Sequence, residues 1–158
     1  MSSTELRFLT LDDVKASGKT VFVRVDMNSP FDPSGKKILD DTRIKMTHDT
    51  LERLKDAKVV VGSHQGRPGD EDFTSLAPHS QLLQRHVSQK VRFVEDVIGP
   101  EARRQIKGLP VGEILVLDNL RLCSEESLSA SPGILARTIM IQRLASLVDL
   151  YVNDAFAT

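Results

Sequence analysis

Cysteine is almost absent from this sequence, since Cys123 is the only one among 158 residues. A single cysteine excludes an internal disulfide and a cysteine-ligated metal cluster, and this usage is typical of a reducing compartment. We interpret Cys123 as a small, half-buried apolar residue. Long apolar runs are absent as well: no stretch approaches the ~18 residues of a membrane helix, and charged residues interrupt the N-terminal region, so no signal peptide is predicted. We therefore expect a cytoplasmic protein without a membrane partner.

The sequence also lacks an excess of charge of either sign. Lysine and arginine number 21 against 22 aspartates and glutamates, which gives a net charge of −1 at pH 7. This balance provides no broad basic surface for nucleic acid or anionic lipid. The Gly-Arg-Pro sequence at 66–68 occurs in peptides that bind the minor groove, but acidic residues follow it here where such peptides need basic ones. We expect no nucleic-acid partner, and any phosphate recognition must be local.

The sequence contains no signature of a nucleotide-phosphate loop or of a metal site. No GxGxxG and no GxxxxGK[ST] segment occurs, so neither nucleotide-phosphate loop is predicted in this chain. His48, His79 and His86 have no carboxylate or cysteine partner at metal-ligand spacing, and no metal site is predicted. We place His79 and His86 on the surface of a helix, and we interpret Glu125 and Glu126 as a solvated turn.

Short β-branched segments alternate with longer segments of helical periodicity. The expected strands cover residues 20–26, 58–63, 90–95, 113–118 and 150–154, and most are near-continuous apolar runs, as in strands covered on both faces. The spacing of Ile44, Leu51 and Leu54 predicts a helix between the first two strands. Further helices are predicted over 75–88, with Pro78 in the first turn, from Pro100 to a stop at Gly108, and over 134–147.

This alternation favours a parallel sheet with right-handed crossovers. We predict an α/β fold: a doubly wound, Rossmann-like parallel sheet in three layers. A chain of 158 residues is long enough for one such domain, which could bury ~70% of its unfolded surface. Ligands in these sheets bind beyond the carboxyl ends of the strands, so functional residues are expected directly after each strand.

Polar side chains follow four of the expected strands. These residues, all expected at the same edge of the sheet, are Asp26, Asn28, His64, Arg67, Asp118, Asn119, Arg121, Asn153 and Asp154, with Arg43 at the start of the first helix. Arginine donates two parallel hydrogen bonds to a phosphate or carboxylate, whereas Asp26 and Asn28 suit substrate hydroxyl groups. One arginine near a strand end is more often a solvated surface charge, but arginines and a histidine at several sites favour a small, anionic, hydroxylated ligand.

Five ordered motifs connect the chain to a known family. The segments VFVRVDMNSP, DDTRIK, GSHQGRP, LDNLRL and DLYVNDAFAT closely resemble, in this order and at these separations, the N-terminal domain of phosphoglycerate kinases. The glutamine in SHQGRP and the DAFAT ending resemble the archaeal branch. The resemblance implies a glycolytic and gluconeogenic enzyme that transfers a phosphoryl group reversibly between ATP and the carboxylate of 3-phosphoglycerate, giving 1,3-bisphosphoglycerate and ADP.

The resemblance also implies roles for individual residues. Asp26 and Asn28 match the residues that orient the substrate, with Asp26 toward its hydroxyl group. Arg43 matches the arginine that binds the carboxyl end of the substrate and stabilises the phosphoryl group during transfer, so it is the expected catalytic residue. The remaining expected substrate-binding residues are His64, Arg67 and Arg121, which match the grip on the non-transferred phosphate, and Met27, Gln65 and Gly66, which lie within the motifs.

The chain departs from the family in a few positions and in length. Met27, Asp118 and Leu122 stand where many relatives have Phe, Glu and Phe, which are conservative or packing changes. We expect residues 1–158 to be a truncated N-terminal phosphoglycerate-binding domain, without the domain that binds Mg-ATP or Mg-ADP in the family, and inactive alone. A monomer is expected. One alternative stays open: a stand-alone α/β module that binds a small anion without catalysis.

Overall fold

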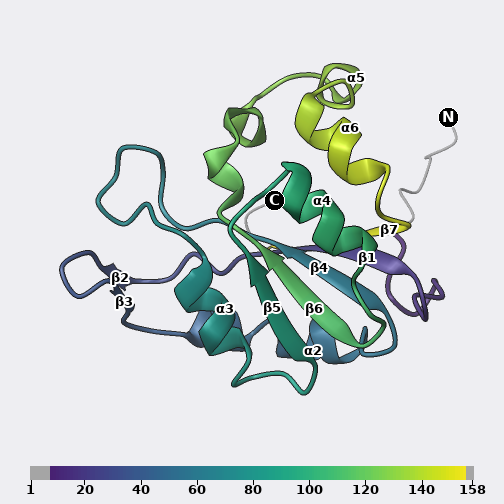
Figure 1. Cartoon of the computed structure of the whole chain (residues 1–158), viewed down its shortest axis with the longest axis horizontal. Coiled ribbons are helices and arrows are strands. Elements are labelled where there is room, and N and C mark those ends of the chain that lie inside the picture. Colours follow the sequence, from purple (N-terminus) through teal and green to yellow (C-terminus); the bar gives the residue numbers. More distant parts are fainter. Residues whose placement is uncertain (1–7, 156–158) are drawn as a thin grey trace, which may run out of the picture.

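A five-stranded parallel sheet forms the centre of the computed structural model, which describes residues 8–155 (Figure 1). Its strands are β1 (Thr20–Val25), β4 (Lys58–Gly62), β5 (Lys90–Val94), β6 (Glu113–Leu117) and β7 (Leu150–Asp154). They lie in the order β5-β6-β4-β1-β7, and every pairing is parallel. All five expected strands are therefore confirmed, and each ends at or one residue before its predicted end.

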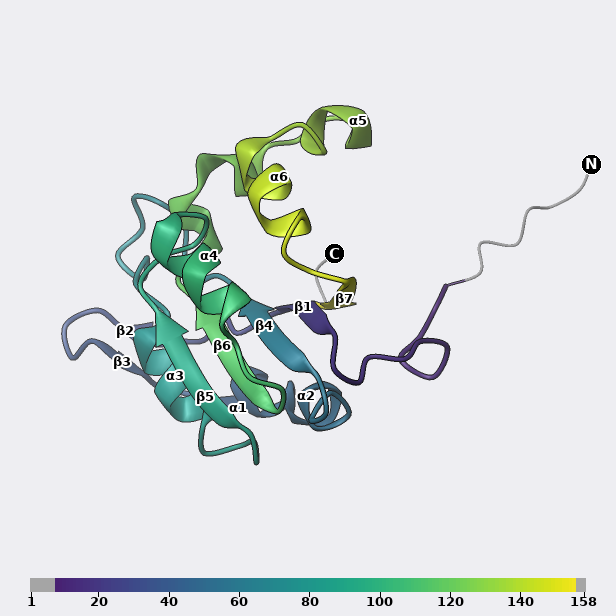
Figure 2. The same cartoon turned by 45° about the vertical axis from the view of Figure 1, so that its right-hand side comes forward.

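Helices cover both faces of the sheet (Figure 2). The helices α1 (Thr42–Lys45), α2 (His48–Glu52) and α3 (Ala77–Leu83) lie on one face, and α4 (Pro100–Lys107) and α6 (Ile139–Ala145) on the other. The connections β1 to β4 to β5 run across the sheet in one direction, whereas β5 to β6 to β7 runs back. Because right-handed crossovers that reverse direction place their helices on opposite faces, this strand order produces the three layers that the sequence predicts.

The side chains of β1 alternate between two cores. Val21, Val23 and Val25 are fully buried with Leu51 of α2 in one core, whereas Phe22 packs in the other with residues of α4 and α6. The period of two residues in a strand requires this alternation. Both faces of β1 therefore pack against an apolar core, which explains the nearly continuous apolar run in the sequence.

Two of the expected helices are broken, and each break occurs at a threonine. The helix predicted through Ile44 to Leu54 is wrong as a single element, because Thr47 donates both its amide (3.2 Å) and its hydroxyl (2.7 Å) to the Ile44 carbonyl. The helix predicted over 134–147 is divided into α5 (Pro132–Leu135) and α6. There Thr138 binds the Leu135 carbonyl in the same way, at 3.0 and 2.7 Å, and its extended backbone begins α6 as the N-cap.

The other two predicted helices are present as single elements. Pro78 lies in the first turn of α3 as expected, although α3 is shorter than the predicted 75–88, because the amides of Arg85 and His86 bind carbonyls only three residues back. The α4 helix begins at Pro100 and is followed by Gly108, as expected. A short antiparallel hairpin, β2 (Phe31–Asp32) and β3 (Lys37–Ile38), was not anticipated.

The remaining expectations concern Cys123, membrane-spanning helices and the DAFAT ending. Cys123 is half-buried, as its interpretation requires. Between residues 8 and 155, no helix has the length and apolarity that a membrane span needs. The last three residues of the DAFAT ending lie outside the described residues.

Candidate functional site

Three hydrogen bonds join the segment after β1 to the segment after β4. The Met27 amide donates to Ser63 Oγ (2.9 Å), the Ser29 amide donates to Gln65 Oε1 (2.9 Å), and in return Asn28 Oδ1 accepts from the Gly66 amide (3.0 Å). The two segments are neighbours because β1 and β4 pair directly in the sheet. The two motifs that contain Asn28 and Gly66 therefore form one rigid unit at the carboxyl ends of the strands.

Buried polar side chains stabilise this unit from the interior of the protein. The side chain of Gln65 is fully buried, and its Oε1 also binds Nε2 of His79 (3.0 Å). The expectation of a surface position for His79 is wrong: its imidazole is fully buried on α3, and burial lowers its pKa to about 4. Asn119, also buried, donates to the backbone carbonyls of Gln65 (2.7 Å) and Thr74 (2.8 Å). These side chains hold the loop after β4 in place.

Asp26 and Arg43 form an ion pair at one end of the site. Nη1 of Arg43 lies 2.5 Å from Oδ2 of Asp26, and Oδ1 of Asp26 accepts the Asn28 amide (3.1 Å). The carboxylate side chain is 9% exposed, whereas that of Arg43 is 52% exposed. Arg43 is thus anchored at one atom and remains open to solvent over half of its side chain.

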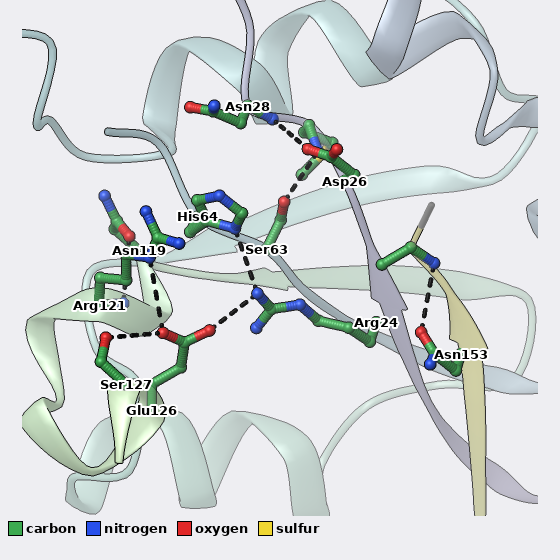
Figure 3. Close-up of polar contacts among 12 residues, drawn as sticks. Arg24, Asp26, Asn28, Ser63, His64, Asn119, Arg121, Glu126, Ser127 and Asn153 are labelled. Carbon is green, nitrogen blue, oxygen red and sulfur yellow. Dashed lines mark hydrogen bonds and ion pairs between the residues drawn. The ribbon is translucent and has the colours of Figure 1, made fainter. Parts of the chain in front are cut away.

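A cluster of charged side chains forms the other end (Figure 3). Nη2 of Arg24 lies 2.8 Å from Glu126 Oε1 and 3.1 Å from His64 Nδ1. Arg121 donates from Nη1 to the Gly66 carbonyl (2.7 Å), and its Nε lies 3.6 Å from Glu126 Oε2. Two arginines, one carboxylate and one histidine therefore converge near the carboxyl ends of β1, β4 and β6, and we name them the Arg24–His64–Arg121–Glu126 cluster.

The interpretation of Glu125 and Glu126 as a solvated turn is wrong. Both lie in the short 3₁₀ helix Ser124–Ser127, and the side chain of Glu126 is only 14% exposed because it faces Arg24 and Arg121. Glu125 instead accepts the amides of Ile139 (3.2 Å) and Met140 (2.7 Å) at the start of α6. One glutamate is thus directed into the cluster and the other to a helix end.

The environment of His64 lowers the pKa of its imidazole. Burial is the largest cause, and the nearby charges of Arg121 and Arg24 act in the same direction, whereas Asp26 and Glu126 oppose them weakly. A neutral imidazole carries one donor nitrogen and one acceptor nitrogen. The positive charge at this end of the site therefore comes from the arginines.

The expected site residues differ in accessibility. Arg67 is exposed, and within residues 8–155 its side chain has no hydrogen bond or ion pair. Met27 is fully buried, so its side chain belongs to the core. Asp118 is also buried, where it accepts the amides of Leu76 (2.9 Å) and Asn119 (2.7 Å). Met27, Gln65, Asp118 and Asn119 thus build the scaffold, and the exposed groups face solvent.

Two members of the cluster were not anticipated from the sequence. Arg24 is the next-to-last residue of β1, between Val23 and Val25, and a charged residue inside an otherwise apolar strand is a signal that could have identified it. Glu126 gives no such signal, because it meets Arg24 across 102 residues of sequence. No group of three or more metal-ligating side chains occurs within the part of the chain that the structure describes.

Comparisons with known proteins agree with this architecture. The sequence pattern of the family described as phosphoglycerate kinase matches residues 11–158. The phosphoglycerate kinase of Saccharolobus solfataricus is 49% identical over 156 residues, and that of Sulfurisphaera tokodaii is 46% identical over 156 residues; each alignment covers 98% of this chain and 38% of the relative. The archaeal resemblance of the motifs is confirmed by these relatives.

Solved structures give the same result. The crystal structure of phosphoglycerate kinase from Pyrococcus horikoshii superposes with a TM-score of 0.87 at 39% identity, covering 96% of this chain and 37% of that one. The enzyme structure from Coxiella burnetii gives a TM-score of 0.70 at 28% identity, covering 96% and 36%. The chain thus spans a little more than a third of the length of these relatives. It belongs to the phosphoglycerate kinase family.

Proposed function

We propose that this chain is the N-terminal, phosphoglycerate-binding part of a phosphoglycerate kinase, and that it binds 3-phosphoglycerate or 1,3-bisphosphoglycerate at the carboxyl ends of β1, β4 and β6. The observation that carries this proposal is the convergence of Arg24, His64 and Arg121 in a chain with a net charge of only −1. The exposed Arg67 directly follows Gly66, whose carbonyl binds Arg121. A local cationic cluster on a nearly neutral molecule favours a small anion over a polyanionic partner.

The geometry supports a division of the ligand between the two ends of the site. At one end, Arg67, Arg121 and the His64 ring suit the non-transferred phosphate, since guanidinium groups bind phosphate through paired hydrogen bonds. At the other end, Asp26 and Asn28 suit the hydroxyl group. Arg43, held at one atom by Asp26, suits the carboxyl end and the transferred phosphoryl group. Phosphoryl transfer depends mainly on positioning and charge neutralisation, which these residues can supply.

The nucleotide is assigned to another part of the whole protein. The chain has no glycine-rich phosphate loop, and its described residues provide no cluster of ligands for the Mg²⁺ that accompanies ATP or ADP. We propose that residues 1–158 bind substrate but do not transfer phosphate alone, and that the whole enzyme is cytoplasmic and monomeric.

Calorimetric titration of the 158-residue chain with 3-phosphoglycerate tests this proposal. Arg67→Ala is expected to weaken binding at least about tenfold, because it removes a charge-assisted hydrogen-bond donor worth about 1.5–3 kcal/mol. Arg85→Ala, at an exposed arginine after α3, is the matched control and should bind like the parent. Equal binding by the parent and Arg67→Ala would contradict the site.

A second comparison separates the enzyme from an anion-binding module. The proposed role requires 3-phosphoglycerate to bind more tightly than inorganic phosphate, because Asp26 and Asn28 add contacts to the hydroxyl group. Equal affinities for the two ligands would favour a module that recognises phosphate alone. A mixture of the chain, 3-phosphoglycerate and Mg-ATP should produce no ADP in a coupled assay.

A further inference from the structure

One nitrogen of Arg24 bridges two partners in the Arg24–His64–Arg121–Glu126 cluster (Figure 3). The same Nη2 lies 2.8 Å from Glu126 Oε1 and 3.1 Å from His64 Nδ1. This nitrogen carries two hydrogens in the plane of the guanidinium group. When one hydrogen is bound by the carboxylate, the planar group directs the other toward the imidazole, so Glu126 sets the direction of the second hydrogen bond.

This arrangement determines which nitrogen of His64 carries its proton. Arginine remains protonated in proteins and is only a donor, so Nδ1 must accept and has no hydrogen of its own. In a neutral imidazole the single hydrogen then belongs to Nε2. Burial, Arg121 and Arg24 all lower the pKa of His64 against the weaker opposing effects of Asp26 and Glu126, which favours this neutral form.

The Nε2 side of the ring is available to a ligand. Within residues 8–155 no group forms a hydrogen bond with His64 Nε2, and Figure 3 shows this nitrogen on the side of the ring away from Arg24. A hydrogen on Nε2 can be donated to a phosphate oxygen, whereas a lone pair there would repel it. The tautomer therefore decides whether His64 attracts or opposes an anion.

We propose that Arg24, oriented by Glu126, is a positioning residue that fixes His64 in the Nε2–H tautomer, so that the ring presents a hydrogen-bond donor to the bound phosphate. The part that concerns the ligand rests on the proposed function. The part that concerns the tautomer is independent of it. Arg24 needs no contact with the ligand in this role, and its partly buried charge is balanced by Glu126.

Long-range ¹H–¹⁵N spectra of the ¹⁵N-histidine-labelled chain test the tautomer directly. The His64 resonances are identified by their loss in His64→Gln. The expected result at neutral pH is a pyrrole-type Nε2 and a pyridine-type Nδ1. A pyrrole-type Nδ1, or a doubly protonated ring, would overturn the proposal, and this measurement requires no Arg24 variant to fold.

Arg24→Met provides the second readout, because it removes the donor and keeps much of the apolar stem. The expected result is a mixture of the two tautomers. Arg92→Met is the matched control: it also removes a strand arginine paired with a glutamate, Glu113, but on β5 at the far edge of the sheet, and it should leave the His64 spectrum unchanged. Retention of the pure Nε2–H tautomer in Arg24→Met would overturn the role of Arg24.

Binding of 3-phosphoglycerate completes the test. We expect the Nε2 resonance to shift during titration and Arg24→Met to bind about three- to tenfold more weakly, the effect of one misdirected hydrogen bond. Unchanged affinity together with a changed tautomer would overturn the positioning role. If the parent has the expected tautomer but binds no 3-phosphoglycerate, the proposed function fails while the assignment of the tautomer is supported.

Discussion

Gly66 and Gly69 both have a positive φ, but only Gly66 is crowded. At Gly66 (φ +62°) an added Cβ would lie 2.6 Å from Asp72 Oδ1 and 2.7 Å from the Phe73 amide nitrogen, whereas at Gly69 (φ +98°) no atom lies within 4 Å. The left-handed conformation alone costs a side chain about 1–2 kcal/mol, and overpacking adds about 1–3 kcal/mol. Gly66 also bonds through its amide to Asn28 and through its carbonyl to Arg121, so displacement of Gly66 would change both ends of the site.

The pair Gly66→Ala and Gly69→Ala separates these effects. We expect Gly69→Ala to lower the free energy of unfolding by about 1 kcal/mol and Gly66→Ala by about 2–4 kcal/mol. Urea denaturation of both variants measures the difference, and titration with 3-phosphoglycerate should show weaker binding for Gly66→Ala. Equal destabilisation would mean that the contacts with Asp72 and Phe73 relax without cost.

His79 should make the stability of the chain depend on acid pH. Burial is the main cause of its low pKa of about 4, and the charge of Asp118 opposes it only in part. The unfolded chain takes up this proton near pH 6.5, but the folded chain does so only near pH 4. The free energy of unfolding is therefore highest above pH 6.5, and it falls as the pH drops toward 4, because protonation favours the unfolded chain. The difference amounts to about 3 kcal/mol.

Urea denaturation between pH 7.5 and 4.5 tests this prediction. His79→Gln, whose amide can still donate to Gln65, should lose much of the pH dependence in this range. His48→Gln, at an exposed histidine, should keep it. The same slope in all three proteins would exclude His79 as the cause.

Among helices and strands, the cap of α6 joins the site to the second core. Glu125 accepts the amides of Ile139 and Met140 at the start of α6, while its neighbour Glu126 reaches Arg24 and Arg121. The 3₁₀ helix Ser124–Ser127 is thus fixed at one side by a helix end and at the other by the cluster. Movement of α6 would therefore be transmitted to Glu126.

Removal of this cap has a measurable consequence. We expect Glu125→Ala to destabilise the chain by about 1–2 kcal/mol, because two helix-end amides lose their acceptor. Glu101→Ala, which removes an exposed glutamate paired with Arg104 in α4, should have a clearly smaller effect on the urea midpoint. If the two variants are equally stable, the bonds of Glu125 contribute no more than a surface ion pair.

Local patterns predicted the strands better than the helices, for a physical reason. Apolar runs such as Val59 to Val61 report burial on both faces, which the sheet then requires. Helix continuity instead depends on Thr47 and Thr138, whose hydroxyl groups compete for backbone carbonyls, and periodicity does not reveal that competition. The motif residues were correctly placed at strand ends, but the partnership of Arg24 with Glu126 depends on tertiary contact and has no local signal.

At the scale of the whole molecule, strand order determines what the site contains. Because β4 lies between β1 and β6, the residues that follow these three strands are neighbours, and Gly66 bonds to both Asn28 and Arg121 although the three are far apart in sequence. The segment after β5 is displaced to the edge and contributes Asp96, which accepts amides at the start of α4. The sheet thus divides its loops into those that build the site and those that fix a helix.

The β7 edge of the sheet is exposed and lies beside apolar surface. Within residues 8–155, β7 pairs with β1 alone, and its Tyr151, 63% exposed, stacks on Phe22 with the ring centroids 6.1 Å apart. Beside it lies a largely apolar cavity of about 630 Å³, lined by residues that include Met140 and Leu144. An edge strand beside exposed apolar surface favours association with another chain. We expect the 158-residue chain alone to associate reversibly as its concentration rises, whatever the state of the whole enzyme.

Sedimentation velocity over a range of concentrations tests this expectation. Tyr151→Lys places a charge on the edge strand and should shift the chain toward the monomer, because lysine on an edge opposes strand pairing. Val111→Lys is the matched control, since Val111 is 52% exposed in the turn before β6 and far in the sheet order from β7. Association of Tyr151→Lys at the same concentrations as the parent and Val111→Lys would show that the chain associates through a surface other than β7.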